Sequence, residues 1–338
     1  MNWITPKSCL SKLQFEFSYH LENRQKTMPQ AFPDLRADRD LVVAVDHSGE
    51  HKGSDYCFST FLLADRAGVL ASWDLQRQLI RNEFLSENQR HSFKGLGDGQ
   101  RQRALLPFLR ASSKINGIVL CVGFEKSIEE SYFDFKIPTE QNYKIKKGVV
   151  AKTIRSALFG SMLVAGLARD GQSLKWITDD DSTVCNDEVQ ELSFSVISSM
   201  LSQCSPFDRM ELSFGIASKF DDDLRAEDLC SIPDLVGGAM SEMLNSISPG
   251  SIPKSAPLYT PGMRKPSIKS GMILAWRSDL QSPLKHIFCL VRPDKDRMRL
   301  SFADPVVTIG GDMPRQLWVP PNKKWMRNLK TPKKTDGA

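Results

Sequence analysis

The sequence predicts an α/β protein in which a mixed sheet is covered by helices on both faces. Three observations carry this prediction. Apolar runs of strand length recur along the chain, beginning with residues 41–45. The first runs follow one another closely, as in antiparallel hairpins, whereas the later runs alternate with helical patterns. Strands that alternate with helices need a helical layer on each side of the sheet.

The chain opens with strands in immediate succession, expected at residues 41–46, 56–64 and 69–72. Asp65 to Gly68 supplies the turn between the last two. Two helices follow, at residues 73–85 and 100–111, and Asp98 is placed to cap the second one. This half of the domain is therefore expected to be an antiparallel meander followed by a helical pair.

The next part alternates strands with helices. Apolar and β-branched runs predict strands at residues 115–124, 174–178 and 210–217. Apolar residues at helical spacing predict helices at residues 147–169, 188–203 and 232–244. These elements complete one domain over residues 39–247, preceded by an N-terminal arm at residues 1–38.

The composition changes after this domain. Residues 248–270 are rich in Pro, Ser and Lys, which predicts a linker or an extended loop. Three short apolar runs follow, at 271–276, 286–291 and 298–302, and predict a small C-terminal β-rich appendage over residues 271–321. The tail at residues 322–338 begins with basic residues and predicts either a contact with phosphate backbone or a solvated, disordered terminus.

Composition places the chain among ordinary soluble globular proteins. Of its 338 residues, 41% are hydrophobic and 25% are charged, and the formal net charge is +5. The seven cysteines are scattered and never form Cys-x-x-Cys, which is typical of reduced cysteines in a cytoplasmic protein and argues against a structural zinc site. The N-terminus does not have the pattern of a signal peptide. The run Leu158–Ala168 falls short of the roughly 20 residues that span a bilayer, so we expect no membrane association.

Acidic residues follow the predicted strands at the points where the strands end. Asp46 ends the first strand and is followed by Ser48-Gly49, so it is either a metal ligand or the cap of a turn. Asp179 and Asp180 end a later strand, and Asp234 opens the last helix of the domain. Carboxylates from separate elements of one sheet can converge at one edge and bind Mg²⁺ or Mn²⁺. Two such ions would support phosphodiester cleavage.

Several motifs resemble those of a large microbial family of unknown function with a ribonuclease H-like fold. Asp46-His47-Ser48-Gly49 resembles the Asp-Glu-Ser-Gly signature that opens the family, and a hairpin strand like Tyr56–Phe61 follows it there too. Phe93–Leu96 resembles a basic segment that precedes a helix in that family. Asp234–Ala239 is similar to the closing helix Ala-Asp-Leu-Ile-Ala-Gly-Ala. The resemblance covers about residues 40–245.

The resemblance implies a metal-dependent nuclease with a two-metal mechanism, acting on RNA, DNA or a hybrid. It implies catalytic roles for Asp46, Asp179 and Asp234. Either Glu50 replaces the acid that the family has at position 47, or His47 acts as a ligand or proton shuttle. The implied metal ligands are Asp46, Asp179, Asp180 and Asp234. The candidate substrate-binding residues are His47, Ser48, Lys94 and Arg101.

Two departures from the family pattern leave an alternative open. His47 stands where the family has Glu, and Pro233 replaces the Ala before the last Asp. The first departure removes a carboxylate. The alternative is a catalytically weakened module that keeps the fold and binds nucleic acid or a protein partner.

Other interpretations of these motifs have less support. A zinc-protease pair of His47 and His51 needs a helix, which a segment directly after a strand does not provide. The triple Asp179–Asp181 also fits a turn followed by a helix cap. Gly95–Gly99 lacks the strand and spacing of a dinucleotide site and fits a flexible loop that contacts substrate. Asp221–Asp223 fits a solvated loop, and no Gly-x-Ser-x-Gly elbow supports Ser48 as an acyl-transfer nucleophile.

Overall fold

The structure is a computed structural model. It describes residues 7–27, 29, 32–35, 39–50, 53–87, 89–126, 147–179, 186–204, 210–219, 224–245, 267–277, 279, 281–294 and 297–303. Residues 248–266 of the predicted linker lie outside the described residues. The basic tail at residues 322–338, together with Asp180, Asp181, His51 and Asp221–Asp223, also lies outside them.

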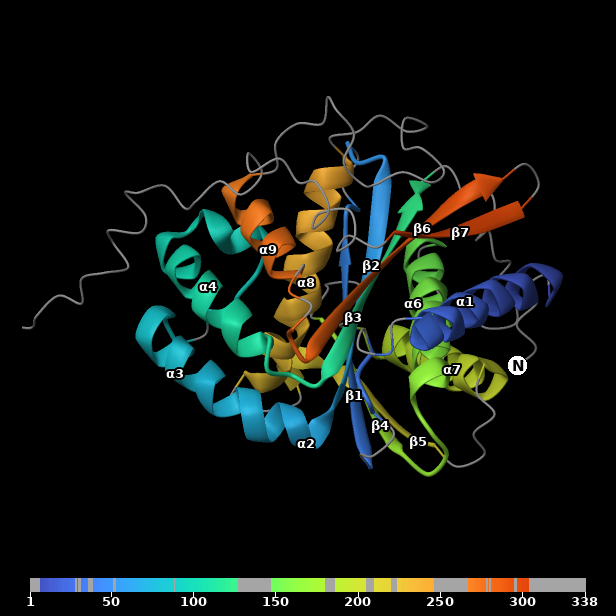
Figure 1. Cartoon of the computed structure of the whole chain (residues 1–338), viewed down its shortest axis with the longest axis horizontal. Coiled ribbons are helices and arrows are strands. Elements are labelled where there is room, and N and C mark those ends of the chain that lie inside the picture. Colours follow the sequence, from blue (N-terminus) through green and yellow to red (C-terminus); the bar gives the residue numbers. More distant parts are fainter. Residues whose placement is uncertain are drawn as a thin grey trace, which may run out of the picture.

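Seven strands form one mixed sheet in the order β5, β4, β1, β2, β3, β6, β7 (Figure 1). Their bounds are β1 Asp40–Ser48, β2 Tyr56–Asp65, β3 Gly117–Glu125, β4 Ser173–Thr178, β5 Glu211–Ile216, β6 Leu284–Asp294 and β7 Arg297–Ala303. β2 is antiparallel to both β1 and β3. β4 is parallel to β1, and β5 is parallel to β4. The predicted α/β class with a mixed sheet is confirmed.

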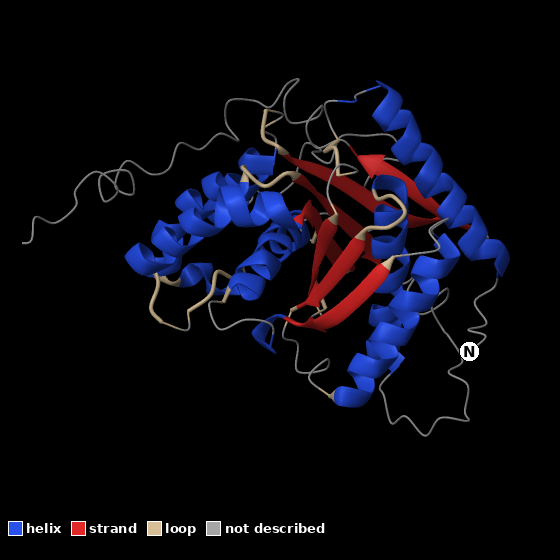
Figure 2. Ribbon diagram, turned by 90° about the horizontal axis from the view of Figure 1, so that it is seen from below, coloured by secondary structure: helices blue, strands red, loops and turns tan. Residues whose placement is uncertain are grey.

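Helices cover both faces of the sheet, as Figure 2 shows from below. One face carries α3 Leu75–Phe84, α4 Gly99–Ser112, α8 Arg225–Leu244 and α9 Ile268–Arg277. The other face carries α1 Lys7–Thr27, α6 Lys147–Leu167 and α7 Asp187–Cys204. The short elements are α2 Arg66–Gly68, η2 Val69–Asp74, η3 Lys94–Gly97 and η4 Ala217–Lys219.

The central strand β1 is buried on both faces, because each face meets a helical layer. Leu41, Val43 and Val45 belong to the core shared with α6 and α7. Val42 and Ala44 belong to the core shared with α8. Successive side chains of a strand point to opposite faces, so this alternation fixes which layer each later residue of β1 meets.

α6 is the most apolar helix of the second layer. Its segment Val149–Leu167 is long and apolar enough to cross a membrane by length and composition alone, but 89% of that segment is buried inside the protein. A helix covered on all sides by its own protein has the pattern of a core helix. α1 packs on α6, and Phe17 of α1 meets Phe159 of α6 edge to face, with ring centroids 6.2 Å apart.

Two of the predicted strands are wrong. Residues 69–72 lie in the π-helix η2, where Val69 and Trp73 are buried on one side, four residues apart. Residues 271–276 lie in α9, whose buried residues Ser270, Ile273, Leu274 and Arg277 follow a helical period. Short apolar runs fit both a strand and one buried face of a helix, which explains both errors.

The predicted C-terminal β-rich appendage is not a separate sheet. β6 pairs in parallel with β3 from Gly117↔Leu284 to Phe124↔Val291, and β7 continues the sheet as its last strand. Without β6, the apolar strand β3 would be an open edge, and open edges of this kind favour pairing with other chains. The C-terminal strands therefore complete the same sheet that carries Asp46.

Candidate functional site

Asp46 and Asp179 lie side by side at the carboxyl ends of two parallel strands. The register of β1 and β4 pairs Val45 with Thr178, which is the residue before Asp179. The backbone N–H of Asp179 donates to the Val45 carbonyl at 3.1 Å. The carboxyl ends of parallel strands in an α/β sheet are where ligands usually bind.

Asp234 reaches the same end of the sheet from α8, which lies across β1 and β2. Gly237 allows the helix to come this close, since an added Cβ would lie 2.9 Å from Ser48 Oγ and 2.8 Å from Thr60 Oγ1. The Asp234 carboxylate accepts a hydrogen bond of 2.8 Å from the Phe93 backbone N–H. The expectation that Asp234 opens its helix is wrong, because α8 begins at Arg225 and continues through Pro233.

The three carboxylates repel one another. Burial, then the charges of Asp234 and Asp179, raise the pKa of Asp46 well above its ordinary value. Burial also raises the pKa of Asp234 to about 6, and Asp179 adds to this shift against the opposing Phe93 hydrogen bond. Nearby like charges disfavour ionisation, so these shifts are those expected of acids that share one site.

Arg90 supplies the positive charge closest to this group, and no sequence pattern pointed to it. Its guanidinium forms a two-pronged ion pair with Asp179, in which Nη2 donates to Oδ2 at 2.9 Å and Nη1 donates to Oδ1. Burial lowers the pKa of Arg90, but the bond to Asp179 and the charges of all three carboxylates outweigh it, so the pKa is raised. The Arg90 side chain retains 30% of its exposure.

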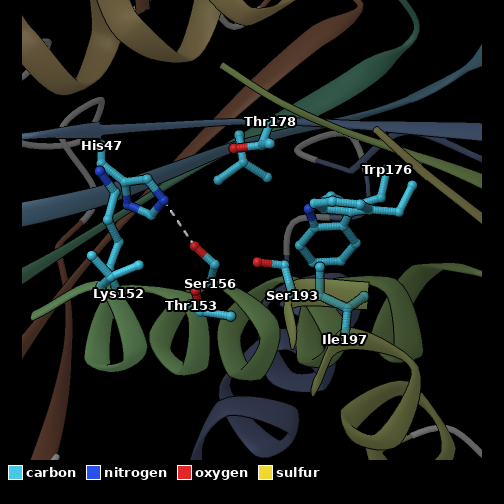
Figure 3. A pocket seen from close by; sticks show the side chains of 11 residues that line it. His47, Lys152, Thr153, Ser156, Trp176, Thr178, Ser193 and Ile197 are labelled. Carbon is cyan, nitrogen blue, oxygen red and sulfur yellow. Dashed lines mark hydrogen bonds between the residues drawn. The ribbon is translucent and has the colours of Figure 1, made fainter. Parts of the chain in front are cut away.

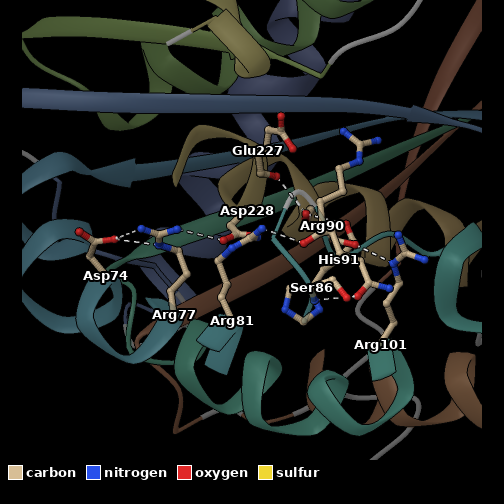
Figure 4. A network of polar contacts seen from close by, with 11 residues as sticks. Asp74, Arg77, Arg81, Ser86, Arg90, His91, Arg101, Glu227 and Asp228 are labelled. Atoms are coloured by element: carbon tan, nitrogen blue, oxygen red, sulfur yellow. Dashed lines mark hydrogen bonds and ion pairs between the residues drawn. The ribbon is translucent and has the colours of Figure 1, made fainter. Parts of the chain in front are cut away.

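Three hydrogen bonds to backbone carbonyls hold the segment that carries Arg90 (Figure 4). Arg81 Nη2 donates to the Gln89 carbonyl at 2.7 Å, and Arg101 Nε donates to the Arg90 carbonyl at 2.8 Å. Ser231 Oγ of α8 donates to the His91 carbonyl at 2.7 Å. The segment between α3 and η3 is thus fixed from both ends.

A buried ionic network anchors α3 to α8 behind this segment (Figure 4). Asp228 of α8 accepts from Arg81 Nη1 at 2.7 Å and from Arg77 Nη1 at 3.1 Å, and Arg77 also pairs with Asp74 at 2.7 Å. Burial raises the pKa of Asp228 to about 6 against the opposing effect of Arg81 and Arg77. Because Arg81 bonds both Asp228 and the Gln89 carbonyl, the network also positions the Arg90 segment.

His47 faces the opposite side of the sheet from Asp46. Its ring nitrogens meet Ser59 Oγ at 3.1 Å and Ser156 Oγ of α6 at 2.9 Å. Burial, then Lys152 and Arg155, lower the pKa of His47 well below its ordinary value, so the ring is neutral. A side chain at position 47 belongs to the α6 layer, and a Glu there would also point away from Asp234.

His47 lines a small pocket between β1, β4, α6 and α7 (Figure 3). Polar side chains occupy the end beside His47, whereas Trp176 and Ile197 close the other end. The lining residues are Val45, His47, Val149, Lys152, Thr153, Ser156, Trp176, Thr178, Ser193, Ile197 and Phe214.

The other predicted site residues are divided between the two faces. Ser48 stands on the Asp46 side, and its Oγ donates to Asp46 Oδ2 at 3.2 Å. Glu50 does not join the three carboxylates; it pairs with Lys152 of α6 at 3.2 Å and its side chain is 44% exposed. Lys94 is exposed in η3, and its charge lowers the pKa of Asp234 against the larger effect of burial.

Arg101 positions the Arg90 segment and lies 3.5 Å from Asp98. Asp98 caps α4 as predicted, since its carboxylate accepts from the Gln100 N–H at 2.9 Å. Lys269 of α9 binds Phe93, the residue whose N–H binds Asp234: its Nζ lies 4.0 Å from the centre of the Phe93 ring and donates to the Phe93 carbonyl at 3.3 Å. Basic side chains therefore flank the carboxylates on the α8 side of the sheet.

The donor chemistry of this site fits a divalent cation in part. Asp46 is buried and Asp234 is half-buried, neither forms a salt bridge within the described residues, and carboxylate oxygens suit Mg²⁺ or Mn²⁺. Asp179 has Arg90 as its partner. Within the described ranges, no three His, Cys, Asp or Glu side chains are gathered closely enough to hold a metal ion.

The chain was also compared with known proteins. No protein-family model and no curated protein sequence matches it.

Proposed function

We propose that this chain is a ribonuclease H-like, metal-dependent phosphodiesterase that hydrolyses nucleic acid, either RNA, DNA or a hybrid. The observation that carries the proposal is the convergence of Asp46, Asp179 and Asp234 at one end of the sheet, on the face covered by α8. Placing the buried Asp46 beside the half-buried Asp179 and Asp234 costs free energy, and a bound divalent cation would offset that cost.

The arrangement of the strands supports the ribonuclease H-like part of the proposal. Among the adjacent strands β3, β2, β1, β4 and β5, the strand β1 is central. Asp46 therefore lies at the same edge of the sheet as the carboxyl ends of β4 and β5, which run parallel to β1. The resemblance predicts this placement of the first and second acids. It also predicts a closing helix with the third acid, which α8 provides through Asp234.

The residues of the chain would divide the work of hydrolysis. Bound Mg²⁺ or Mn²⁺ would supply an activated water and stabilise the leaving oxygen. Asp46 and Asp234 would hold the cations, while the hydrogen bonds from Ser48 and from the Phe93 N–H orient their carboxylates. Lys94 acts on Asp234 and Lys269 lies against the neighbouring Phe93, so both would attract the phosphate backbone.

The test is cleavage of labelled single-stranded RNA, single-stranded DNA and an RNA–DNA hybrid in 5 mM Mn²⁺. We expect Asp46→Asn and Asp234→Asn to lower the cleavage rate at least 100-fold while the protein stays folded. Asp170→Asn is the matched control, because Asp170 is exposed at the amino end of β4, away from the site. Wild-type activity in both site variants contradicts the proposal.

The Arg90–Asp179 ion pair favours a second candidate, a module that binds nucleic acid without cutting it. A guanidinium that already neutralises Asp179 reduces the need for a metal ion there. In this case the wild-type protein binds oligonucleotides in EDTA as tightly as in Mn²⁺ and leaves them intact.

A further inference from the structure

Arg90 is held where it neutralises the acidic site but can also reach solvent. Its Nη2 lies 2.9 Å from Asp179 Oδ2, and its pKa responds to Asp234 and Asp46 as well. The Arg90 side chain is nevertheless 30% exposed, against 14% for the Asp179 side chain. The same cation therefore faces both the carboxylates and the solvent from which a substrate arrives.

The backbone beneath Arg90 is fixed, so a movement of this residue is confined to its side chain. The Arg90 carbonyl accepts from Arg101, the neighbouring His91 carbonyl accepts from Ser231, and the Gln89 carbonyl accepts from Arg81. A long side chain on a rigid base can exchange partners at little cost in backbone entropy. Arg also binds a phosphate through the same fork of N–H groups that it uses for a carboxylate.

A divalent cation and the Arg90 guanidinium compete for the same oxygens. Both Asp179 oxygens accept from Arg90, so neither has its full capacity for a metal ion while the pair is intact. Binding of a cation of charge +2 near Asp46 and Asp234 also repels the guanidinium. The displaced Arg90 then needs a new acceptor, and a phosphodiester entering from solvent is one.

We propose that Arg90 is an exchangeable counter-ion, which neutralises Asp179 in the metal-free protein and transfers to a phosphate group of nucleic acid when a divalent cation binds. This inference rests on the proposed function, and it assigns Arg90 to the binding of substrate. The exchange breaks two hydrogen bonds to Asp179 and makes two to the phosphate, and no proton moves.

The first experiment measures Mn²⁺ binding by titration calorimetry. Arg90→Met removes the competitor, and we expect it to bind Mn²⁺ at least fivefold more tightly than wild type. Arg90→Lys keeps the charge without the two-pronged geometry, so its Mn²⁺ affinity should lie between those of wild type and Arg90→Met. Arg169→Met is the charge-matched control, since Arg169 is an exposed cation at the amino end of β4, away from the carboxylates, and we expect a change below twofold.

The second experiment measures binding of a fluorescent oligonucleotide by anisotropy, in EDTA and in Ca²⁺, with a gel to check that the oligonucleotide stays intact. In EDTA we expect wild type and Arg90→Met to agree within twofold, because Arg90 is engaged by Asp179. In Ca²⁺ we expect Arg90→Met to bind at least fivefold more weakly than wild type. Asp179→Asn releases Arg90 and should bind at least threefold more tightly than wild type in EDTA.

The results separate this inference from the proposed function. If Arg90→Met binds Mn²⁺ no more tightly than wild type and Arg169→Met, the exchange is refuted even when Asp46→Asn abolishes cleavage. If Arg90→Met gains Mn²⁺ affinity that an added Asp46→Asn removes, and also loses oligonucleotide affinity in Ca²⁺, the exchange holds even when wild type cuts nothing. Unchanged oligonucleotide affinity in Ca²⁺ refutes the transfer to phosphate. If neither protein binds Mn²⁺, both proposals fail. If Arg90→Met does not fold, the oligonucleotide affinity of Asp179→Asn in EDTA decides the question. An affinity equal to that of wild type overturns the inference.

Discussion

Replacing Asp234 by Asn removes one negative charge from the candidate site and keeps an oxygen that can accept the Phe93 N–H. In the folded protein the pKa of Asp234 is raised from 3.8 to about 6, first by burial. A raised pKa means that the folded state binds the proton more tightly than the unfolded state does. The free energy of unfolding therefore falls as the pH rises from about 4 and reaches its lower plateau above about 6.

The size of the effect follows from that shift. A shift of one pKa unit corresponds to about 1.4 kcal/mol, so ionising Asp234 lowers the free energy of unfolding by about 2–3 kcal/mol at pH 8. Asn carries no charge at any pH. We therefore expect Asp234→Asn to be more stable than wild type by about 2–3 kcal/mol at pH 8 in EDTA, and equal to it below pH 4.

The assay is thermal and urea unfolding of both proteins between pH 4 and pH 8. In EDTA the melting temperature of the variant should exceed that of wild type by several degrees at pH 8. Adding 5 mM Mn²⁺ should stabilise wild type and leave the variant unchanged, because a ligand stabilises only the state that binds it. If the difference in stability between the proteins stays constant across the pH range, the raised pKa of Asp234 is refuted.

Three further substitutions test other parts of the fold by urea unfolding. Gly49→Ala should lower the free energy of unfolding by about 2 kcal/mol or more, because Gly49 has φ +79° and an added Cβ would lie 2.4 Å from the Tyr56 carbonyl oxygen. Asp228→Ala should lower it by about 3–5 kcal/mol, since Arg77 and Arg81 lose their buried partner. Arg277→Met should raise it, because none of the Arg277 nitrogens has a hydrogen-bond partner in the structure and the side chain is 2% exposed. An unchanged or opposite result contradicts the reasoning in each case.

The sequence predicted the elements whose patterns are long and regular. The helices at 147–169 and 188–203 appear as α6 and α7, and the strand at 174–178 appears as β4, because each buries a whole face in one of the two cores. Residues 271–276 were assigned to the wrong class, since a six-residue run with five apolar side chains does not distinguish a strand from one face of α9.

The acids of the site could be predicted because each has a fixed relation to a regular element. Asp46 and Asp179 end strands that the apolar pattern reveals, and parallel pairing brings them together. Arg90 could not be predicted this way, because it lies in an irregular segment whose position depends on Arg81, Arg101 and Ser231 from three separate helices. The opposite orientations of Asp46 and His47 follow from strand geometry, which also weakens the argument that position 47 decides catalysis.

The pairing of β3 with β6 has a consequence for how the chain folds. β3 ends at Glu125 and β6 begins at Leu284, so this parallel pair closes a loop of more than 150 residues. Contacts between residues so far apart slow folding, because the chain entropy is lost before the contacts form. During synthesis β3 emerges long before its partner, and α1 packs on β7 as well as on α6. The N-terminal helix therefore cannot complete its packing until the last strand of the sheet has left the ribosome.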